Sequence, residues 1–329
     1  MKFGIQIYRS MEETIELGKL AEKVGFDYLW IADVPPLRDT AATLAVLAMN
    51  TKKIKLGTAV AGFFTRHPLV WASTATTIQE LSDGRFTFGI SVGGFLSRAK
   101  MGIELAKPAR TTRNQIAVFR KLLKGEPATY KDKYTTMNDF KLAYPVDPRP
   151  IPIYVGARGP KMLELTGEVA EGLLTEGSTR TLREGKKYLK RGAEKAGRNM
   201  SDFDVAYLPT SFWLSKEVSK KDMDMLKMSG APSILDSVPE IHKLLGLDKV
   251  PVEMLRKALI RGDFGKVPEY LPDEILREFA IIGDLETCIS RIEELEKCGM
   301  TQLVLVDTIG PNTSEVLKTF GEKVIPAFK

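Results

Sequence analysis

The segment GARGPK, at 156–161, has the residue types of an anion-binding turn. It follows an apolar run typical of a strand and precedes a run with helical spacing. Glycine lets the backbone come close to a ligand, and Pro160 suits a first helical turn because its missing N–H would be unpaired there. The free N–H groups, the helix dipole and the Arg158 guanidinium could together hold a phosphate. The alternative is an ordinary strand-to-helix turn with solvated basic side chains.

A second polar, glycine-containing segment, TEGST at 175–179, follows the next strand-like run. Consecutive parallel strands usually lie side by side, so the two turns would face the same ligand. This arrangement favours one phosphate site over two unrelated turns. The residues that we expect to line this site are Gly156, Ala157, Arg158, Gly159, Glu176, Gly177 and Ser178.

Small residues follow two earlier strand-like runs and leave room for a flat ring. Gly93 lies in the segment SVGG, and Ala59 and Val60 lie in the segment TAVAG. Adjacent glycines allow a ring to lie against the backbone, although a turn with positive φ would need the same residue. Asp33 ends another run, YLWIA, where a buried carboxylate needs a partner or else caps the following loop.

Few conventional acid–base or metal-binding groups occupy these positions. The sequence contains two histidines and therefore cannot build a multi-histidine metal site, and it carries neither an HExxH nor a Walker A motif. His67 precedes a proline and is expected to pack in a loop. Such a set of residues is typical of a site in which a bound cofactor performs the chemistry. We therefore expect no metal ion.

These segments must be positioned by an alternation of strands and helices that runs through most of the chain. Strands are predicted at 2–8, 28–32, 54–60, 86–92, 151–155, 173–175, 203–214 and 303–307. Eight strands alternating with helices predict a parallel α/β fold, the (β/α)8 TIM barrel, whose active site lies at the carboxyl ends of the strands. An open doubly wound sheet is less favoured, because no glycine-rich fingerprint follows the first strand.

The interval between the seventh and eighth strands breaks this rhythm. Residues 215–283 are rich in predicted helix and contain several prolines and glycines, so we interpret them as a helical insertion over the barrel mouth. The 329 residues would suggest two domains at about 150 residues each. A barrel of about 250 residues plus this insertion accounts for the length as one domain, 1–329.

Composition and charge place the chain among ordinary globular proteins. It is 43% hydrophobic and 27% charged, with a net charge of +6 and a pI near 9.0. Basic and acidic residues alternate, which is typical of solvated helix faces. No apolar run approaches the ~18 residues of a membrane span. The N-terminus lacks the apolar segment of a signal peptide, and two cysteines form no disulfide framework. We therefore expect a cytoplasmic protein that binds small molecules and neither nucleic acid nor membrane.

Several segments, taken in order, resemble the bacterial-luciferase-like superfamily. They include KFGIQIY, GFDYLWIAD, TRHP, LSDGRFTFGIS, IPIYVGARGPKMLELTGEVAEGLL and GDLETCISRIEELEKCGMTQLVL. Within that superfamily they are most similar to the coenzyme F420-dependent methylenetetrahydromethanopterin reductases. The similarity covers nearly the whole chain and is weakest over about 212–275.

The resemblance implies a barrel with a deazaflavin, coenzyme F420, in its mouth. The family carries a non-prolyl cis peptide at the end of the third strand, and the matching step is Ala59-Val60. This step and Gly93 would support the central ring, and the two turns described above would hold the phosphate. Gln6 and Asp33 would orient the substrate as the catalytic pair. Members of the family are usually homodimers or homotetramers.

The sequence departs from these reductases on the substrate side. Gln6 stands where they carry a glutamate implicated in proton handling, and glutamine can form hydrogen bonds but cannot titrate. Their Asp-His pair is Asp33-Val34 here, and their charged residues after the fourth strand are Gly94 and Phe95. The substrate is therefore left open between methylenetetrahydromethanopterin and a more hydrophobic molecule.

Three functions are compatible with these residues. The first is an F420-dependent oxidoreductase that moves a hydride between the deazaflavin and a substrate carbon, while the protein positions the reactants and excludes water. The second is an FMN-dependent monooxygenase that uses molecular oxygen, because flavin and deazaflavin both present a ring and a ribityl phosphate. The third is a non-catalytic cofactor-binding barrel.

Overall fold

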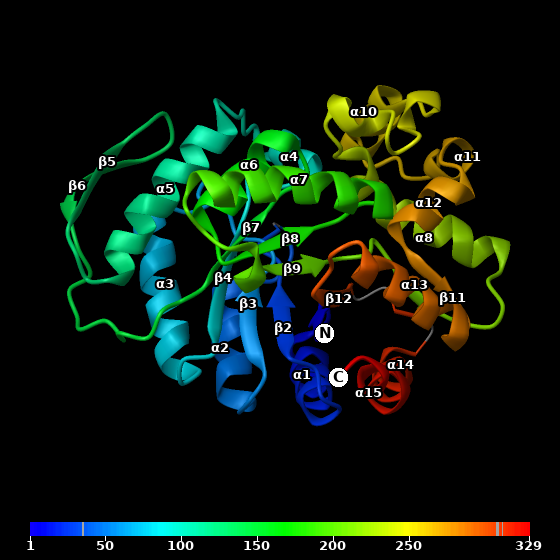
Figure 1. Cartoon of the computed structure of the whole chain (residues 1–329), viewed down its shortest axis with the longest axis horizontal. Helices are drawn as coiled ribbons and strands as arrows, with labels where there is room; N and C mark the ends of the chain where they lie inside the picture. The colour runs from blue at the N-terminus through cyan, green and yellow to red at the C-terminus, as the bar shows by residue number, and fades with distance from the viewer. Residues whose placement is uncertain (35, 307–308, 311) are drawn as a thin grey trace.

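The described part of the chain contains eight parallel strands that close into a barrel (Figure 1). A computed structural model describes residues 1–34, 36–306, 309–310 and 312–329. The strands follow one another around the barrel in the order β1-β12-β9-β8-β7-β4-β3-β2. Their bounds are β1 Lys2–Gln6, β2 Tyr28–Ile31, β3 Lys55–Thr58, β4 Phe86–Ile90, β7 Ile153–Gly156, β8 Gly172–Thr175, β9 Asp204–Tyr207 and β12 Gln302–Val306. The predicted TIM barrel is confirmed.

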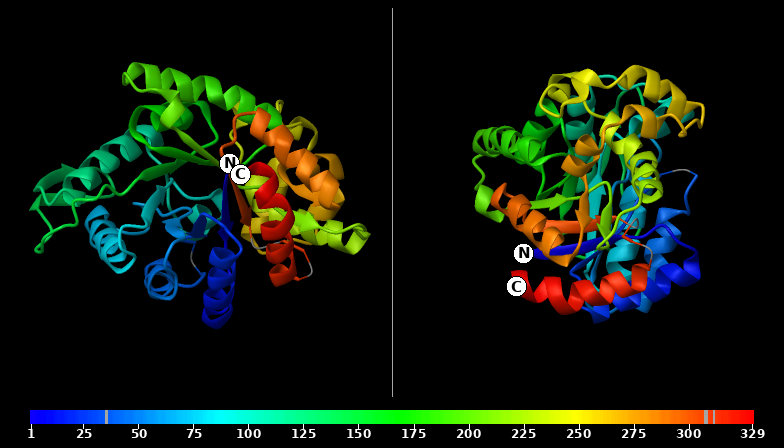
Figure 2. Two further views of the ribbon diagram at one scale, coloured as in Figure 1. Left: turned by 60° about the horizontal axis from the view of Figure 1, so that its bottom comes forward. Right: turned by 90° about the vertical axis from the view of Figure 1, so that its right-hand side faces the viewer.

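Helices cover the outside of the barrel, as Figure 2 shows. They are α1 Met11–Lys23, α2 Thr40–Asn50, α3 Pro68–Leu81, α5 Pro108–Leu123, α6 Pro160–Val169, α7 Thr179–Lys195, α13 Leu285–Lys297, α14 Thr313–Thr319 and α15 Ile325–Phe328. Local chemistry sets their starts: Ser10 and Glu13 form a capping box at α1, and Asp39 accepts the N–H of Ala42 at α2. None of the described helices is long and apolar enough to cross a membrane.

The core has two layers, one inside the barrel wall and one between the wall and the helices. Trp30 belongs to the inner layer, is fully buried, and donates its indole N–H to the side-chain oxygen of Gln302 at 3.0 Å. It fits because a neighbouring strand carries glycine: a Cβ on Gly57 would lie 2.3 Å from the Trp30 ring. The inner layer therefore fills the barrel and leaves its mouth as the place for a ligand.

A helical insertion separates the seventh and eighth strands of the barrel. It contains α8 Lys220–Leu235, α9 Pro239–His242, α10 Val252–Ile260, α11 Val267–Tyr270 and α12 Asp273–Phe279. These helices enclose a core of their own, in which Leu226, Leu255 and Leu276 are fully buried. Figure 1 shows them beside the barrel, with α10 next to α4 (Phe95–Met101). The predicted insertion is confirmed, and the assignment of the whole chain to one domain stays a prediction.

The predicted seventh strand, 203–214, is wrong as one continuous strand. Only β9 belongs to the barrel, whereas β10, Phe212–Leu214, pairs with β11, Ile281–Gly283, in a separate two-stranded sheet. Pro209 lies between β9 and β10 and has no N–H to donate to a ladder, so the barrel strand ends before it.

Two smaller features complete the description of the strands. β5, Ala128–Lys131, and β6, Thr136–Phe140, form an antiparallel hairpin away from the barrel. The predicted eighth strand agrees with β12 up to Val306, and Asp307 lies outside the described residues.

Candidate functional site

The carboxyl ends of β1, β2 and β3 meet at one rim of the barrel, which we call the mouth. Gln6 ends β1, is 3% exposed, and donates its side-chain N–H to the carbonyl oxygen of Ala59. The peptide bond that follows this carbonyl, Ala59-Val60, is cis, as the resemblance implies. The N–H of Asp33 donates to the Val60 carbonyl at 3.4 Å. The structure thus brings Gln6, Asp33, Ala59 and Val60 together.

Asp33 is a largely buried carboxyl group at this mouth. Its side chain is 8% exposed and lies 4.0 Å from the Arg66 guanidinium, and it accepts the Thr65 hydroxyl at 3.1 Å. Burial raises the pKa of Asp33, and the opposing effects of Arg66 and Thr65 do not cancel that rise. A carboxyl group with a raised pKa keeps its proton at higher pH, so it can donate a hydrogen bond as well as accept one.

Gly93, predicted to lie near the ring, and Gly156, predicted to line the phosphate site, are glycines for different structural reasons. Gly93 has a φ of +79°, a conformation that favours glycine, and it lines a small cavity at the mouth together with Asp33 and Val60. Gly156 instead allows strands to approach closely, because a Cβ there would lie 2.8 Å from the Cβ of Ser91. The remaining lining of the cavity is largely apolar, with Val34, Ala61, Phe64, Val92, Met101 and Ile103.

The two predicted phosphate turns lie next to each other at the ends of β7 and β8. The N–H of Ala157 donates to the Leu174 carbonyl at 3.1 Å, and the Thr175 hydroxyl donates to the Ala157 carbonyl at 2.8 Å. Gly177 has a φ of +146°, and its carbonyl accepts the Tyr207 hydroxyl at 2.6 Å. The expected juxtaposition of the two turns is therefore present.

The helices that begin at these turns, α6 and α7, differ in whether a side chain caps their first N–H groups. Ser178 caps α7: its hydroxyl accepts the N–H of Thr181, and its own N–H donates to the Thr181 hydroxyl at 2.8 Å. Gly159 provides α6 with no side-chain cap, and Pro160 stands in the first turn. The N-terminus of α6 is therefore the one whose N–H groups are open to an anion.

Arg158 lies at the predicted phosphate site and is bound there by carboxylates. Its guanidinium donates to Asp236 at 2.8 Å and to the Ser233 carbonyl, and it lies 3.2 Å from Glu176. Burial raises the pKa of Glu176, and Arg158 partly offsets this rise. Arg98 adds a second cation 3.5 Å from Asp236. We call Arg98, Arg158, Glu176 and Asp236 the rim cluster.

Sequence reasoning missed Asp236 and Arg98, and it also missed the pair Thr65 and Arg66. Asp236 carries no local signal, because the folding of the insertion brings it to an arginine 78 positions earlier. Thr65 and Arg66 could have been found, since the TRHP segment directly follows the small residues after the third strand.

His67 has a local role at the start of a helix. His67 caps α3, its Nδ1 accepting the N–H of Leu69 at 3.2 Å. Within the described ranges, no group of three or more His, Cys, Asp or Glu side chains is placed to hold a metal ion. What the mouth offers is a cavity, an open helix N-terminus and a few hydrogen-bonding groups.

Similarity to known proteins extends along nearly the whole chain. The sequence profile described as luciferase-like monooxygenase matches residues 4–302. The chain belongs to this family. It is 36% identical to the 5,10-methylenetetrahydromethanopterin reductase of Methanolobus tindarius, with 99% of this chain and 100% of that protein covered. The reductase of the same name from Archaeoglobus fulgidus is 34% identical, with 100% of both chains covered.

One solved structure has the same fold over nearly its full length. It is the coenzyme F420 dependent tetrahydromethanopterin reductase from Methanopyrus kandleri, with a TM-score of 0.86 and 31% sequence identity. The comparison covers 100% of this chain and 99% of that chain. The resemblance to luciferase-like proteins, and within them to these reductases, is confirmed.

Proposed function

We propose that this protein is a coenzyme F420-dependent oxidoreductase that moves a hydride to or from a carbon atom of a small organic substrate. The observation that carries the proposal is the composition of the mouth: among the described residues that line its cavity, Asp33 and Arg98 are the charged ones. The described lining includes no histidine, cysteine or lysine, which favours chemistry supplied by a bound group. The luciferase-like relatives described above support a deazaflavin as that group.

The residues of the mouth fit a flat ring that carries a phosphate. Ala61, Gly62, Gly93 and Gly94 are among the residues that line the cavity, and their small size leaves backbone surface available to a ring. The N-terminus of α6 offers N–H groups without a side-chain cap. A bound deazaflavin would supply the carbon that accepts or releases the hydride. The Ala59-Val60 segment and Gly93 would support the ring, and α6 with Arg158 would hold the phosphate.

Gln6 would act on the cofactor side of the mouth, and Asp33 would act on the substrate side. Gln6 holds the Ala59 carbonyl and so positions the segment that supports the ring. Asp33 lines the cavity with a carboxyl group whose raised pKa allows it to bind a substrate heteroatom as donor or acceptor. The apolar walls, including Phe64 and Met101, favour a substrate with an apolar surface and exclude water from the reacting atoms.

The decisive experiment identifies the cofactor. The purified protein is denatured, and the released ligand is analysed by mass spectrometry; protein without ligand is first incubated with F420 or FMN. We expect F420 to be released or bound. FMN alone, with oxygen consumption on reduction, would establish the monooxygenase alternative, and binding of neither would favour a non-catalytic barrel or a different ligand.

The substrate is tested separately, because the cofactor does not determine it. Native protein and the Gln6→Glu variant are assayed with reduced F420 and methylenetetrahydromethanopterin. Activity in the native protein would assign that substrate, whereas activity in the variant alone would show that the residue at position 6 excludes it. Inactivity of both would direct the search to more hydrophobic substrates.

We also propose a homodimer or homotetramer in the cytoplasm. Residues 40–50 of α2 include no charged side chain, and α2 and α3 each carry an exposed apolar residue, with Met49 63% and Val70 49% exposed. Such a face is suited to a subunit contact. Light scattering would measure the mass, and Met49→Lys is expected to shift it toward the monomer. A native mass equal to one chain would refute the assembly.

A further inference from the structure

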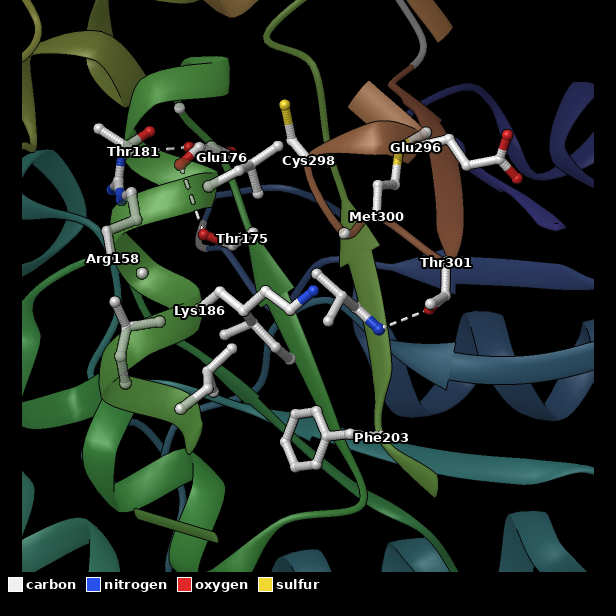
Figure 3. A pocket seen from close by; sticks show the side chains of 18 of the residues that line it. Arg158, Thr175, Glu176, Thr181, Lys186, Phe203, Glu296, Cys298, Met300 and Thr301 are labelled. Carbon is white, nitrogen blue, oxygen red and sulfur yellow. Dashed lines mark hydrogen bonds and ion pairs between the residues drawn. The ribbon is translucent and has the colours of Figure 1, made fainter. Parts of the chain in front are cut away.

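A cavity of about 570 Å³ lies outside the barrel wall, between α7 and the segment that follows α13 (Figure 3). Leu173 of β8 and Val205 of β9 line it and belong to the outer core layer. Their neighbours Leu174 and Ala206 belong to the inner layer, inside the barrel. The barrel wall therefore separates this cavity, which we call the lateral cavity, from the barrel interior, while Arg158, Glu176 and Gly177 of the two turns line its end at the rim.

The lateral cavity exists because α7 is packed tightly on α6. A Cβ on Gly192 of α7 would lie 1.9 Å from the Glu164 carbonyl oxygen, and a Cβ on Gly167 of α6 would lie 2.1 Å from the Leu189 carbonyl oxygen. These contacts hold α7 close to α6 and leave a gap on its other side. Gly185 of α7 adds no side chain to that gap.

The walls of the lateral cavity are mostly buried apolar side chains. They come from Leu163, Leu173, Leu182, Leu189, Phe203, Val205 and Met300. Its volume lies within the ~300–1,000 Å³ of small-molecule sites. Covering this surface with an apolar chain would remove it from water, which is favourable by about 25 cal/mol per Å².

Lys186 provides a cation at this cavity. Its stem crosses from α7 toward Gly299: a Cβ on Gly299 would lie 3.5 Å from Lys186 Cδ and 3.6 Å from its Nζ. The ammonium group has no ion pair or hydrogen bond to any residue that the structure describes, whereas the adjacent Lys187 pairs with Glu184 at 2.6 Å. Figure 3 shows Lys186 reaching across the cavity, with the carboxylate of Glu296 directed away from it.

We propose that the lateral cavity binds a small amphiphilic carboxylic acid, such as a medium-chain fatty acid. Its alkyl chain would lie among the apolar walls, and its carboxylate would pair with Lys186. Arg158 also lines the cavity, but it is paired with Glu176 and Asp236 and belongs to the proposed phosphate site, so Lys186 is the described side-chain cation left for a head group. This favours a monoanionic carboxylate over a phosphate ester.

Calorimetric titration with decanoate and with decanol tests the proposal. We expect one molecule of decanoate per chain, bound more tightly than decanol, because only the acid can pair with Lys186. Lys186→Met keeps an apolar stem and should weaken decanoate binding roughly fivefold, the limit for an ion pair of an exposed lysine, without affecting decanol. Lys187→Met is the matched control, because Lys187 does not line the cavity, and it should leave both affinities unchanged.

A second variant tests the cavity itself. Val205→Phe places a larger ring on the outer face of β9 and should weaken both ligands at least tenfold, with circular dichroism showing that the fold is retained. Absence of decanoate binding by the native protein would overturn the site. Equal affinity of native protein and Lys186→Met for decanoate would overturn the role of Lys186, as would decanol binding as tightly as decanoate.

Discussion

Replacing Arg158 by alanine tests the proposed phosphate site most directly. The guanidinium is 20% exposed and lies beside the uncapped N-terminus of α6. A hydrogen bond to a charged group contributes about 1.5–3 kcal/mol. We expect the lower end, about 1.5 kcal/mol, because Glu176 and Asp236 already neutralise part of the cation. This corresponds to roughly tenfold weaker binding of a phosphate-bearing cofactor.

The assay compares cofactors with and without the phosphate. Titrations follow the binding of F420 and of the deazaflavin that ends at the ribityl hydroxyl, and the pair FMN and riboflavin serves the same purpose. Arg158→Ala should weaken the phosphate-bearing member of each pair and leave the other unchanged. Equal weakening of both members would refute a phosphate contact and indicate that the variant disturbs the mouth as a whole.

A second variant, at Asp236, should have the opposite effect on the affinity for a phosphate-bearing cofactor. Asp236→Asn keeps the shape of the side chain that accepts from Arg158 but removes its negative charge. Affinity for the phosphate-bearing cofactor should then rise by up to about 1 kcal/mol, roughly fivefold, and the gain should shrink at high salt. Weaker binding of the phosphate by this variant would show that the carboxylate serves the site by holding the insertion in place and does not compete for Arg158.

Three other substitutions have defined expectations. Gln6→Glu places a carboxyl group against the Ala59 carbonyl and should lower the free energy of unfolding by about 1–3 kcal/mol when that group is ionised. Thermal unfolding should show that this loss of stability grows from pH 5 to pH 8. An equal loss at both pH values would contradict the expectation. Burial raises the pKa of Asp33, so the contribution of this carboxyl group to stability is present below about pH 4 and is lost as the pH rises through the raised pKa. The Asp33→Asn variant should therefore become more stable relative to the native protein over that pH range. Its pH–activity profile should also lack the inflection that the titration of Asp33 causes. Gly192→Ala should destabilise the protein by about 1–3 kcal/mol in urea, because its Cβ would lie 1.9 Å from a carbonyl oxygen of α6.

The sequence predicts those parts of the site that follow from strand order. Gln6, Asp33 and Ala59 each stand at the end of a strand, and parallel strands end on the same rim, so their meeting follows from the barrel alone. Arg158 and Glu176 meet for the same reason, because β7 and β8 are neighbours in both sequence and space. Local rules of this kind need no knowledge of distant segments.

The parts that could not be predicted depend on the insertion. Asp236 binds Arg158 only because α8 ends over the barrel rim, and no pattern in the insertion shows where its helices pack. The break in the predicted seventh strand is different, since Pro209 stood in the sequence as a signal against a continuous strand. The lateral cavity depends on glycine contacts between α6 and α7, whose register only the packed helices reveal.

The rim cluster links the insertion to the barrel rim at the proposed phosphate site. Asp236 interacts with Arg98 after β4 and with Arg158 after β7, two neighbouring strands of the barrel. With both carboxyl groups ionised the cluster has no net charge, which is a poor environment for a phosphate. Burial raises the pKa of Glu176, and an anion nearby would raise it further, so protonation of Glu176 would leave the two arginines with one carboxylate and a net positive charge. Phosphate binding at the proposed site would therefore be accompanied by proton uptake at Glu176.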